Sequence, residues 1–259
     1  MSFLAGNASR VMLGGYELSG YFDKVTMTRQ QALFDTSVLN VNAETYLPTL
    51  YSGDLMLTGL FDGAASPNNV ADVALDAAFT ATKGAPFAYA PMGWGVGNVA
   101  YIGICNESDS KVTSPIKGYV ATEASVKAEG ASAGTQGPGS IGYAINRGQC
   151  LTTWAATSMS GAGTSQDGGA SSSNGAMAAF FATGWVGTTP TWTGEVDHSS
   201  DNVTFVALVT SQNFSGSVPA SQLLAVAPGT TINRYVEPKD TIGGTGGPSV
   251  TRLIAFARF

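Results

Sequence analysis

Ile116-Lys-Gly-Tyr-Val-Ala-Thr-Glu-Ala-Ser-Val-Lys127 is the longest apolar–polar alternation in the chain. One set of alternating positions is apolar and the other is polar or aromatic: Ile116, Val120, Ala124 and Val126 against Lys117, Tyr119, Glu123 and Lys127. A period of two residues predicts a β-strand with one face buried and the other in water. The chain is therefore expected to be built on sheets.

Further strand patterns extend this prediction to the rest of the chain. Between Val99 and Cys105 both alternating faces are apolar, which predicts a strand that is covered on both sides. In the C-terminal part, short strands separated by turn residues such as Gly184 and the run 243–247 predict an all-β sandwich. These expected strands are 176–183, 191–196, 203–211, 222–227, 231–236 and 249–259.

One helix is expected, from Asn69 to Thr80. Its apolar residues recur three and four positions apart, and Asn69 is a suitable N-cap. The stretch 130–174 is mostly small and polar, and we place a domain boundary within it. The prediction is a mainly β chain with a first domain at 1–147, containing an inter-strand loop at about 29–52, and a C-terminal sandwich at 148–259.

The composition excludes several classes of protein. Only 12% of the 259 residues are charged, against roughly 25% in average proteins, and the net charge is -6. These values do not fit a disordered chain, a helical bundle or a nucleic-acid-wrapping protein. So few charges suggest that other copies cover much of the surface. The acidic surplus belongs to residues 1–129, which hold 12 acidic and 7 basic residues.

The sequence contains no recognisable catalytic motif. His198 is the single histidine, and no G-x-S-x-G elbow provides a nucleophile for it. Cys105 and Cys150 lack the spacing of zinc ligands, and we interpret them as small buried apolar residues. We therefore expect no enzyme, and no catalytic, cofactor-binding or metal site.

Two groups of residues have alternative interpretations. Asp197, Asp201 and Asn202 supply oxygen ligands for a weak calcium site, or else form an Asx turn between strands. Four tryptophans form either a sugar-stacking platform or anchors in cores and interfaces: Trp94, Trp154, Trp185 and Trp192.

Four segments, in this order along the chain, resemble segments of one family of viral proteins. The first is Leu50-Tyr-Ser-Gly-Asp-Leu-Met-Leu-Thr-Gly-Leu-Phe-Asp62. The second is Val196-Asp-His-Ser-Ser-Asp-Asn-Val-Thr-Phe-Val-Ala-Leu-Val-Thr210, and Thr231-Ile-Asn-Arg-Tyr-Val236 and Ser249-Val-Thr-Arg-Leu-Ile-Ala-Phe-Ala-Arg258 follow it. Together they resemble the major tail, or tail tube, proteins of long-tailed bacteriophages. Residues 63–110 do not align with that pattern.

The resemblance implies a fold and an assembly. The N-terminal half would be a tail-tube-type β-sandwich with one short helix, and the C-terminal sandwich would lie on the outside of the tube. Six copies would form a ring, rings would stack, and genomic DNA would pass through the lumen without specific binding. Partners would be the tape measure, tail terminator and baseplate proteins, with a weak host-surface contact through the C-terminal domain. The protein would be assembled in the bacterial host cytoplasm and reside in the virion tail.

Under this interpretation two sets of residues become candidates. The apolar inter-strand loop would contact a neighbouring ring, unless it is an ordinary core loop, through Leu33, Phe34, Val38, Leu39, Tyr46, Leu47, Leu50 and Tyr51. An acidic lumen would repel phosphates through Asp23, Asp54, Asp62 and Glu123. The alternatives are a capsid decoration protein and a carbohydrate-binding or adhesive sandwich.

Overall fold

The computed structural model describes residues 8–35, 46–61, 70–81, 84–129, 145–216 and 219–259. Within these ranges the chain is mainly β with a single helix, α1 (Val70–Thr80), which confirms the predicted fold class. The buried residues of the helix, Ala71, Ala74, Leu75 and Ala78, recur three and four positions apart, whereas Ala77, which the pattern placed on the apolar face, is exposed. No helix in the described ranges has the length and apolarity that a membrane span requires.

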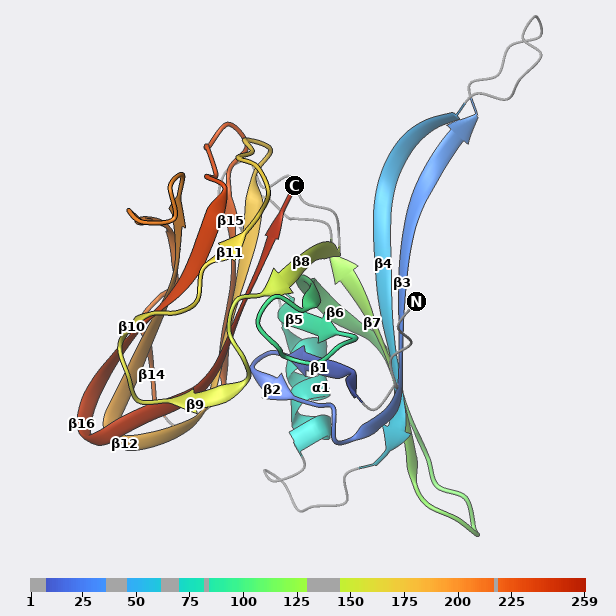
Figure 1. Cartoon of the computed structure of the whole chain (residues 1–259). Helices are drawn as coiled ribbons and strands as arrows, with labels where there is room; N and C mark the ends of the chain where they lie inside the picture. Colours follow the sequence, from blue (N-terminus) through green and yellow to red (C-terminus); the bar gives the residue numbers. More distant parts are fainter. Residues whose placement is uncertain (1–7, 36–45, 62–69, 82–83, 130–144, 217–218) are drawn as a thin grey trace, which may run out of the picture.

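The N-terminal part contains a four-stranded antiparallel sheet in the order β3-β4-β7-β6 (Figure 1). Its helix-side face packs against α1 through a core that includes Leu55, Leu57 and Val126. The strands of this part are β1 (Arg10–Leu13), β2 (Tyr16–Glu17), β3 (Phe22–Asp35), β4 (Tyr46–Leu60), β5 (Ala85–Ala90), β6 (Val99–Thr113) and β7 (Ala121–Glu129).

The C-terminal part is built on two long strands paired with one another, β12 (Ala176–Ser199) and β16 (Tyr235–Arg258). Shorter strands lie along them (Figure 1). These are β9 (Ala155–Thr157), β10 (Gly161–Ala162), β11 (Gln166–Asp167), β13 (Val206–Thr210), β14 (Phe214–Ser215) and β15 (Ala220–Val226).

Strand β8 (Asn146–Cys150) joins the two parts. It pairs with β6 on one side and with β16 on the other, so one sheet continues from the N-terminal to the C-terminal half. A Cβ at Gly148 would lie 2.1 Å from the Phe256 carbonyl oxygen, so glycine allows this close approach. A single core cluster contains residues of both halves, among them Ile102 and Phe181. The predicted boundary at 147/148 falls inside β8 and stays a prediction.

Several predicted strand ends were wrong. Strand β7 begins at Ala121, and Ile116 is fully exposed in the preceding turn, although Ala124 and Val126 are buried as predicted. The expected turns at Gly184 and at 243–247 lie inside β12 and β16. Gly184 has a φ of 59°, and the pairing shifts register beside it, so the two strands absorb these glycines as bulges.

The predicted inter-strand loop at 29–52 is largely strand. Residues 29–35 belong to β3 and residues 46–52 to β4. The two strands pair from Phe22–Gly59 out to Asp35–Tyr46, with irregularities on the way. Figure 1 shows this hairpin running past the rest of the molecule.

Candidate assembly interface

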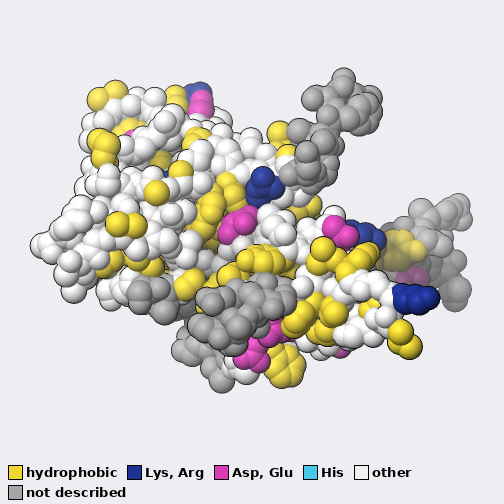
Figure 2. Space-filling view, turned by 90° about the horizontal axis from the view of Figure 1, so that it is seen from below, with side chains coloured by type: hydrophobic (Ala, Val, Ile, Leu, Met, Phe, Trp, Pro, Cys, Tyr) yellow, Lys and Arg dark blue, Asp and Glu magenta, His cyan; other side chains and the backbone are white. Residues whose placement is uncertain are grey.

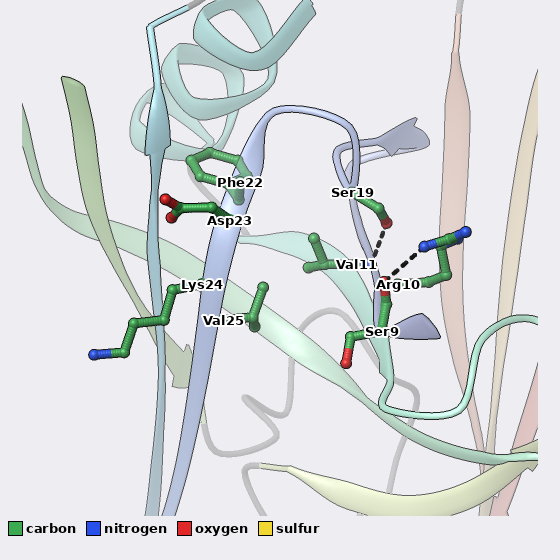
Figure 3. A pocket seen from close by; sticks show the side chains of 8 residues that line it. All are labelled: Ser9, Arg10, Val11, Ser19, Phe22, Asp23, Lys24 and Val25. Carbon is green, nitrogen blue, oxygen red and sulfur yellow. Dashed lines mark hydrogen bonds between the residues drawn. The ribbon is translucent and has the colours of Figure 1, made fainter. Parts of the chain in front are cut away.

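A cavity of about 650 Å³ lies between β1 and β3 (Figure 3). Two hydrogen bonds join residues of its lining: the Ser19 hydroxyl accepts from the Val11 N–H at 2.8 Å, and Arg10 donates to the Ser9 carbonyl at 3.0 Å. In Figure 3, Asp23 points away from this hydrogen-bonded group. The two hydrogen bonds hold the chain segments beside this cavity in place.

The most distinctive feature of the N-terminal sheet is its pair of open edges. Strand β3 pairs only with β4, and residues 106–113 of β6 pair only with β7, among the residues that the structure describes. Since the order is β3-β4-β7-β6, these two edges lie at opposite sides of one sheet. Open edges carry unpaired backbone N–H and C=O groups that pair readily with another chain.

The two edges are compatible with each other. All three pairings between the four strands are antiparallel. Strand β3 of one copy placed beside β6 of the next would therefore also run antiparallel, and the sheet would continue from copy to copy. Repetition of this step can close into a ring, which removes every open edge.

Two of the acidic lumen candidates lie on the face of this sheet that is turned away from α1. Asp54 and Glu123 alternate with the core residues of β4 and β7. Each acid faces a lysine on the adjacent strand, because Asp54 pairs with Lys127 and Glu123 pairs with Lys111. The face therefore carries both signs of charge.

The other two candidates lie elsewhere. Asp23 lies at a register irregularity of β3 between Phe22 and Lys24, and it is exposed. Asp62 lies outside the described residues. The acidic lumen itself stays a prediction.

The hairpin of β3 and β4 exposes several of the predicted inter-ring residues. Leu33 and Phe34 are 58% and 64% exposed, and Tyr46 and Tyr51 are also exposed. Gln31 donates a hydrogen bond to the Tyr51 hydroxyl at 2.7 Å. Val38 and Leu39 lie outside the described residues, as do the side chains of Leu47 and Leu50, whose backbones belong to β4.

The cysteines behave as apolar core residues. Both are buried and free, and burial raises the pKa of the Cys150 thiol to about 12. The pKa of Cys105 is raised further by burial and by the charge of Glu107. Thiols held protonated in this way are poor nucleophiles and poor metal ligands, which confirms their interpretation as core residues.

The polar turn at the end of β12 is an Asx turn. The Asp201 carboxylate accepts hydrogen bonds from the N–H groups of Val203 and Thr204 at 2.9 Å each. These bonds and one with Ser199 lower the pKa of Asp201 to about 2. His198 accepts a hydrogen bond from the Asn233 N–H at Nδ1, and burial lowers its pKa.

The tryptophans are core residues. Trp192 and Trp94 are buried, whereas Trp154 and Trp185 are partly buried against core clusters. Their anchoring interpretation is thereby confirmed. Among the described residues, no group of three His, Cys, Asp or Glu is placed to hold a metal ion.

Sequence reasoning missed a buried ionic network in the C-terminal part. The Trp192 indole donates to Asp240 at 2.8 Å, and the Arg252 guanidinium binds the same carboxylate, with its shortest contact at 2.7 Å. Arg252 also donates to the Thr153 carbonyl. Trp192 on β12 lies 48 residues before Asp240 and meets it through the β12–β16 pairing, and Arg252 lies 12 residues after Asp240 on β16, so no local pattern could reveal the network.

Figure 2 shows one face of the molecule, on which charged side chains are few and lie among hydrophobic and uncharged polar ones. This distribution agrees with the low charge of the sequence. It is also the composition expected of a surface that other subunits cover in part.

Comparison with known proteins finds likenesses in structure alone. No protein-family model and no curated protein matches the sequence. A chain of the native gene transfer agent virion matches with 13% identity and a TM-score of 0.40, over 50% of this chain and 96% of that chain. The SPP1 tail tube protein matches with 11% identity and a TM-score of 0.40, over 48% and 74%.

A third match spans nearly the whole chain. The SPP1 Dit protein, of the hub adsorption apparatus of phages infecting Gram-positive bacteria, has 10% identity and a TM-score of 0.39, over 97% of this chain and 99% of its own. The first two matched chains come from a gene transfer agent virion and from a tail tube.

Proposed function

We propose that the chain is a structural, non-enzymatic protein of a long-tailed bacteriophage virion, where it forms the tail tube. Copies join side by side through the β3 edge of one and the β6 edge of the next, and six copies close a ring. Rings stack into a tube, and DNA passes through its lumen during ejection. The tape measure, terminator and baseplate proteins are the expected further partners.

The pair of open edges is the observation that carries this proposal. An isolated subunit leaves the 14 residues of β3 with one partner strand, and such long edges promote pairing with another chain. Ring closure satisfies both edges in every copy. A binding module or a monomeric adhesin has no need of two matched antiparallel edges on one sheet.

The face with Asp54 and Glu123 is assigned to the lumen in this arrangement. Among the residues that the structure describes, α1 and the core cover the opposite face, so the first face is the one proposed to line the channel. Basic surfaces bind DNA by releasing its counterions. On this face the lysines are matched by acids, which would let DNA slide without a lasting contact.

The ends and the outside of the tube follow from the same arrangement. The hairpin of β3 and β4 projects past the subunit and exposes Leu33, Phe34, Tyr46 and Tyr51, so it would contact the adjacent ring. The C-terminal sandwich, attached through β8, would lie on the outer surface. There it would make a weak contact with the host surface.

Amide hydrogen exchange tests the proposed edge pairing. The purified chain is compared at low and at high concentration, and peptides covering 22–31 and 106–113 are followed. Exchange at both edges should slow by roughly tenfold or more on assembly, because free N–H groups acquire partners. Peptides from the β12–β15 pairing at 176–182 serve as the control and should change little.

Two results would contradict the pairing. One is a protein that assembles while both edges exchange as they do in the monomer. The other is assembly that protects only the C-terminal part, which would favour a role for the sandwich in place of the tube.

A further inference from the structure

A second hollow, of about 270 Å³, lies between α1 and the strands β6 and β7. Its lining combines carboxylates with hydroxyl groups and an apolar rim: Asp72, Leu75, Asp76, Phe79, Glu107, Ser110, Val112 and Thr122. Phe79 is 65% exposed and stands at the rim. The proposed function leaves this hollow unexplained.

Two buried polar atoms face the hollow without a partner. Glu107 is 7% exposed and Thr122 is 6% exposed, yet Oε2 of Glu107 and Oγ1 of Thr122 make no hydrogen bond within the described chain. Burial raises the pKa of Glu107, and the charges of Asp76, Asp72 and Asp109 raise it further, while Ser110 opposes them. A buried carboxylate oxygen left unpaired is costly, so the hollow is suited to a cationic donor.

The shape of the hollow favours the head of a long side chain over a bare metal ion. A calcium ion needs six to eight oxygen ligands at 2.3–2.6 Å, and the described residues contain no group of three acids placed to hold a metal. The hollow, of about 270 Å³, is far larger than the space that a single bound water or bare ion needs. A guanidinium carries five N–H donors in one plane and stacks on aromatic rings such as the exposed Phe79.

The position of the hollow indicates where the cation comes from. Glu107, Ser110 and Val112 belong to the open stretch of β6, along which the β3 strand of a second copy would run. In the continued sheet, the helix-side residues of that strand would lie beside the hollow. Lys24 and Arg29 are the cations of β3.

Arg29 lies on the helix side of β3. It pairs with Gly53, and a Cβ built on Gly53 would contact the side chain of Ile145 in the core. The side chains of this pair therefore lie on the face that carries α1. Met27 is the next residue of β3 on this face. Strand pairing places it in one row across the sheet with Leu55, Val126 and Glu107. Arg29 is exposed, and no ion pair joins it to another described residue.

We infer that Arg29 of a second copy inserts into the hollow beneath α1 and pairs with Glu107, with Asp72 and Asp76 adding to its field. This inference rests on the proposed edge pairing and names the charge pair that sets its register. A single cation on the helix-side face of β3 can reach the buried acid on β6 in only one strand register. The charge pair therefore favours that register over the others.

A charge-swap series tests the pair in the full chain. The protein concentration at half-assembly is measured by sedimentation for Glu107→Gln, Arg29→Glu, Glu107→Arg and the double variant Arg29→Glu/Glu107→Arg. Each single variant should raise that concentration roughly 30-fold or more, because one partner of a buried pair is lost. The double variant should recover most of this loss.

Glu107→Gln separates assembly from folding. It removes a buried charge but keeps the shape of the side chain, so the unfolding midpoint of the monomer should stay the same or rise while assembly weakens. Lys24→Glu is the matched control, since it reverses a charge on the same strand and on the other face. This control should assemble within roughly threefold of the wild type.

The outcomes distinguish the inference from the proposed function. A wild type that never assembles overturns both. A wild type that assembles, with Glu107→Gln and Arg29→Glu no weaker than Lys24→Glu, overturns the arginine pairing and leaves the ring intact. Assembly that EDTA abolishes as completely as Glu107→Gln does would show a divalent cation in the hollow and would also overturn the pairing.

Discussion

Some buried acids stabilise the fold through ion pairs and hydrogen bonds, whereas another keeps a carboxylate oxygen without a partner in the described chain. Asp240 belongs to the first group, since it accepts from Trp192 and pairs with Arg252 inside the C-terminal core. Glu107 belongs to the second, since its Oε2 is buried and has no hydrogen-bond partner in the described part of the chain. The two acids look alike in the sequence and differ only in what the strands place around them.

Asp240→Ala should destabilise the protein strongly, because Arg252 stays buried without its counter-charge. We expect a loss of about 3 kcal/mol or more in the free energy of unfolding, measured by urea denaturation. Asp167→Ala is the matched control, since the Asp167–Arg234 pair is close to half exposed, and it should have a much smaller effect. Equal effects of the two variants would contradict a buried role for Asp240.

Local sequence predicts the roles of some single residues and not of others. The burial of Cys105 and Cys150 and the Asx turn at Asp201 follow from residue type and local spacing, and both predictions were confirmed. The placement of Glu107 against Thr122 and α1 depends on a strand pairing that no local pattern encodes.

At the scale of elements, hydrophobic periodicity predicted the helix and the β-rich class, but not the strand ends. The helix was placed within a residue of its observed start, because its apolar spacing is unambiguous. Glycine-rich positions were interpreted as turns, whereas β12 and β16 pass through them as bulges, because a long partner strand stabilises the irregularity. The length of the segment 29–52 and its place between two strands predict a long apolar loop, although its two sides pair as strands.

The hairpin of β3 and β4 is the element with the clearest prediction. Phe34→Asp places a charge on its exposed apolar part, which would contact the next ring. The variant should still fold and form single rings, but tubes should shorten or disappear in electron micrographs. Met159→Asp, at an exposed methionine of the C-terminal part, is the matched control and should leave tube length unchanged. Tubes of normal length from Phe34→Asp would remove the hairpin from the contact between rings.

At the scale of the whole molecule, low charge and the two open edges have one explanation. A sheet that continues from copy to copy buries both edges and needs few charges on the surfaces that are covered. The sequence indicated covered surfaces from its composition and a tail protein from its motifs. Which edges would meet depends on the order of the strands in the sheet, and that order is known only from the structure.

Electron microscopy of the purified chain at increasing concentration shows directly whether copies close into rings. Pairing of β3 with β6 should give closed rings with a central pore and six-fold symmetry, stacked into tubes, with the four-stranded sheets continuous around the pore. A chain that stays monomeric at every concentration, or that forms particles in which β3 and β6 of neighbouring copies do not meet, would contradict this pairing.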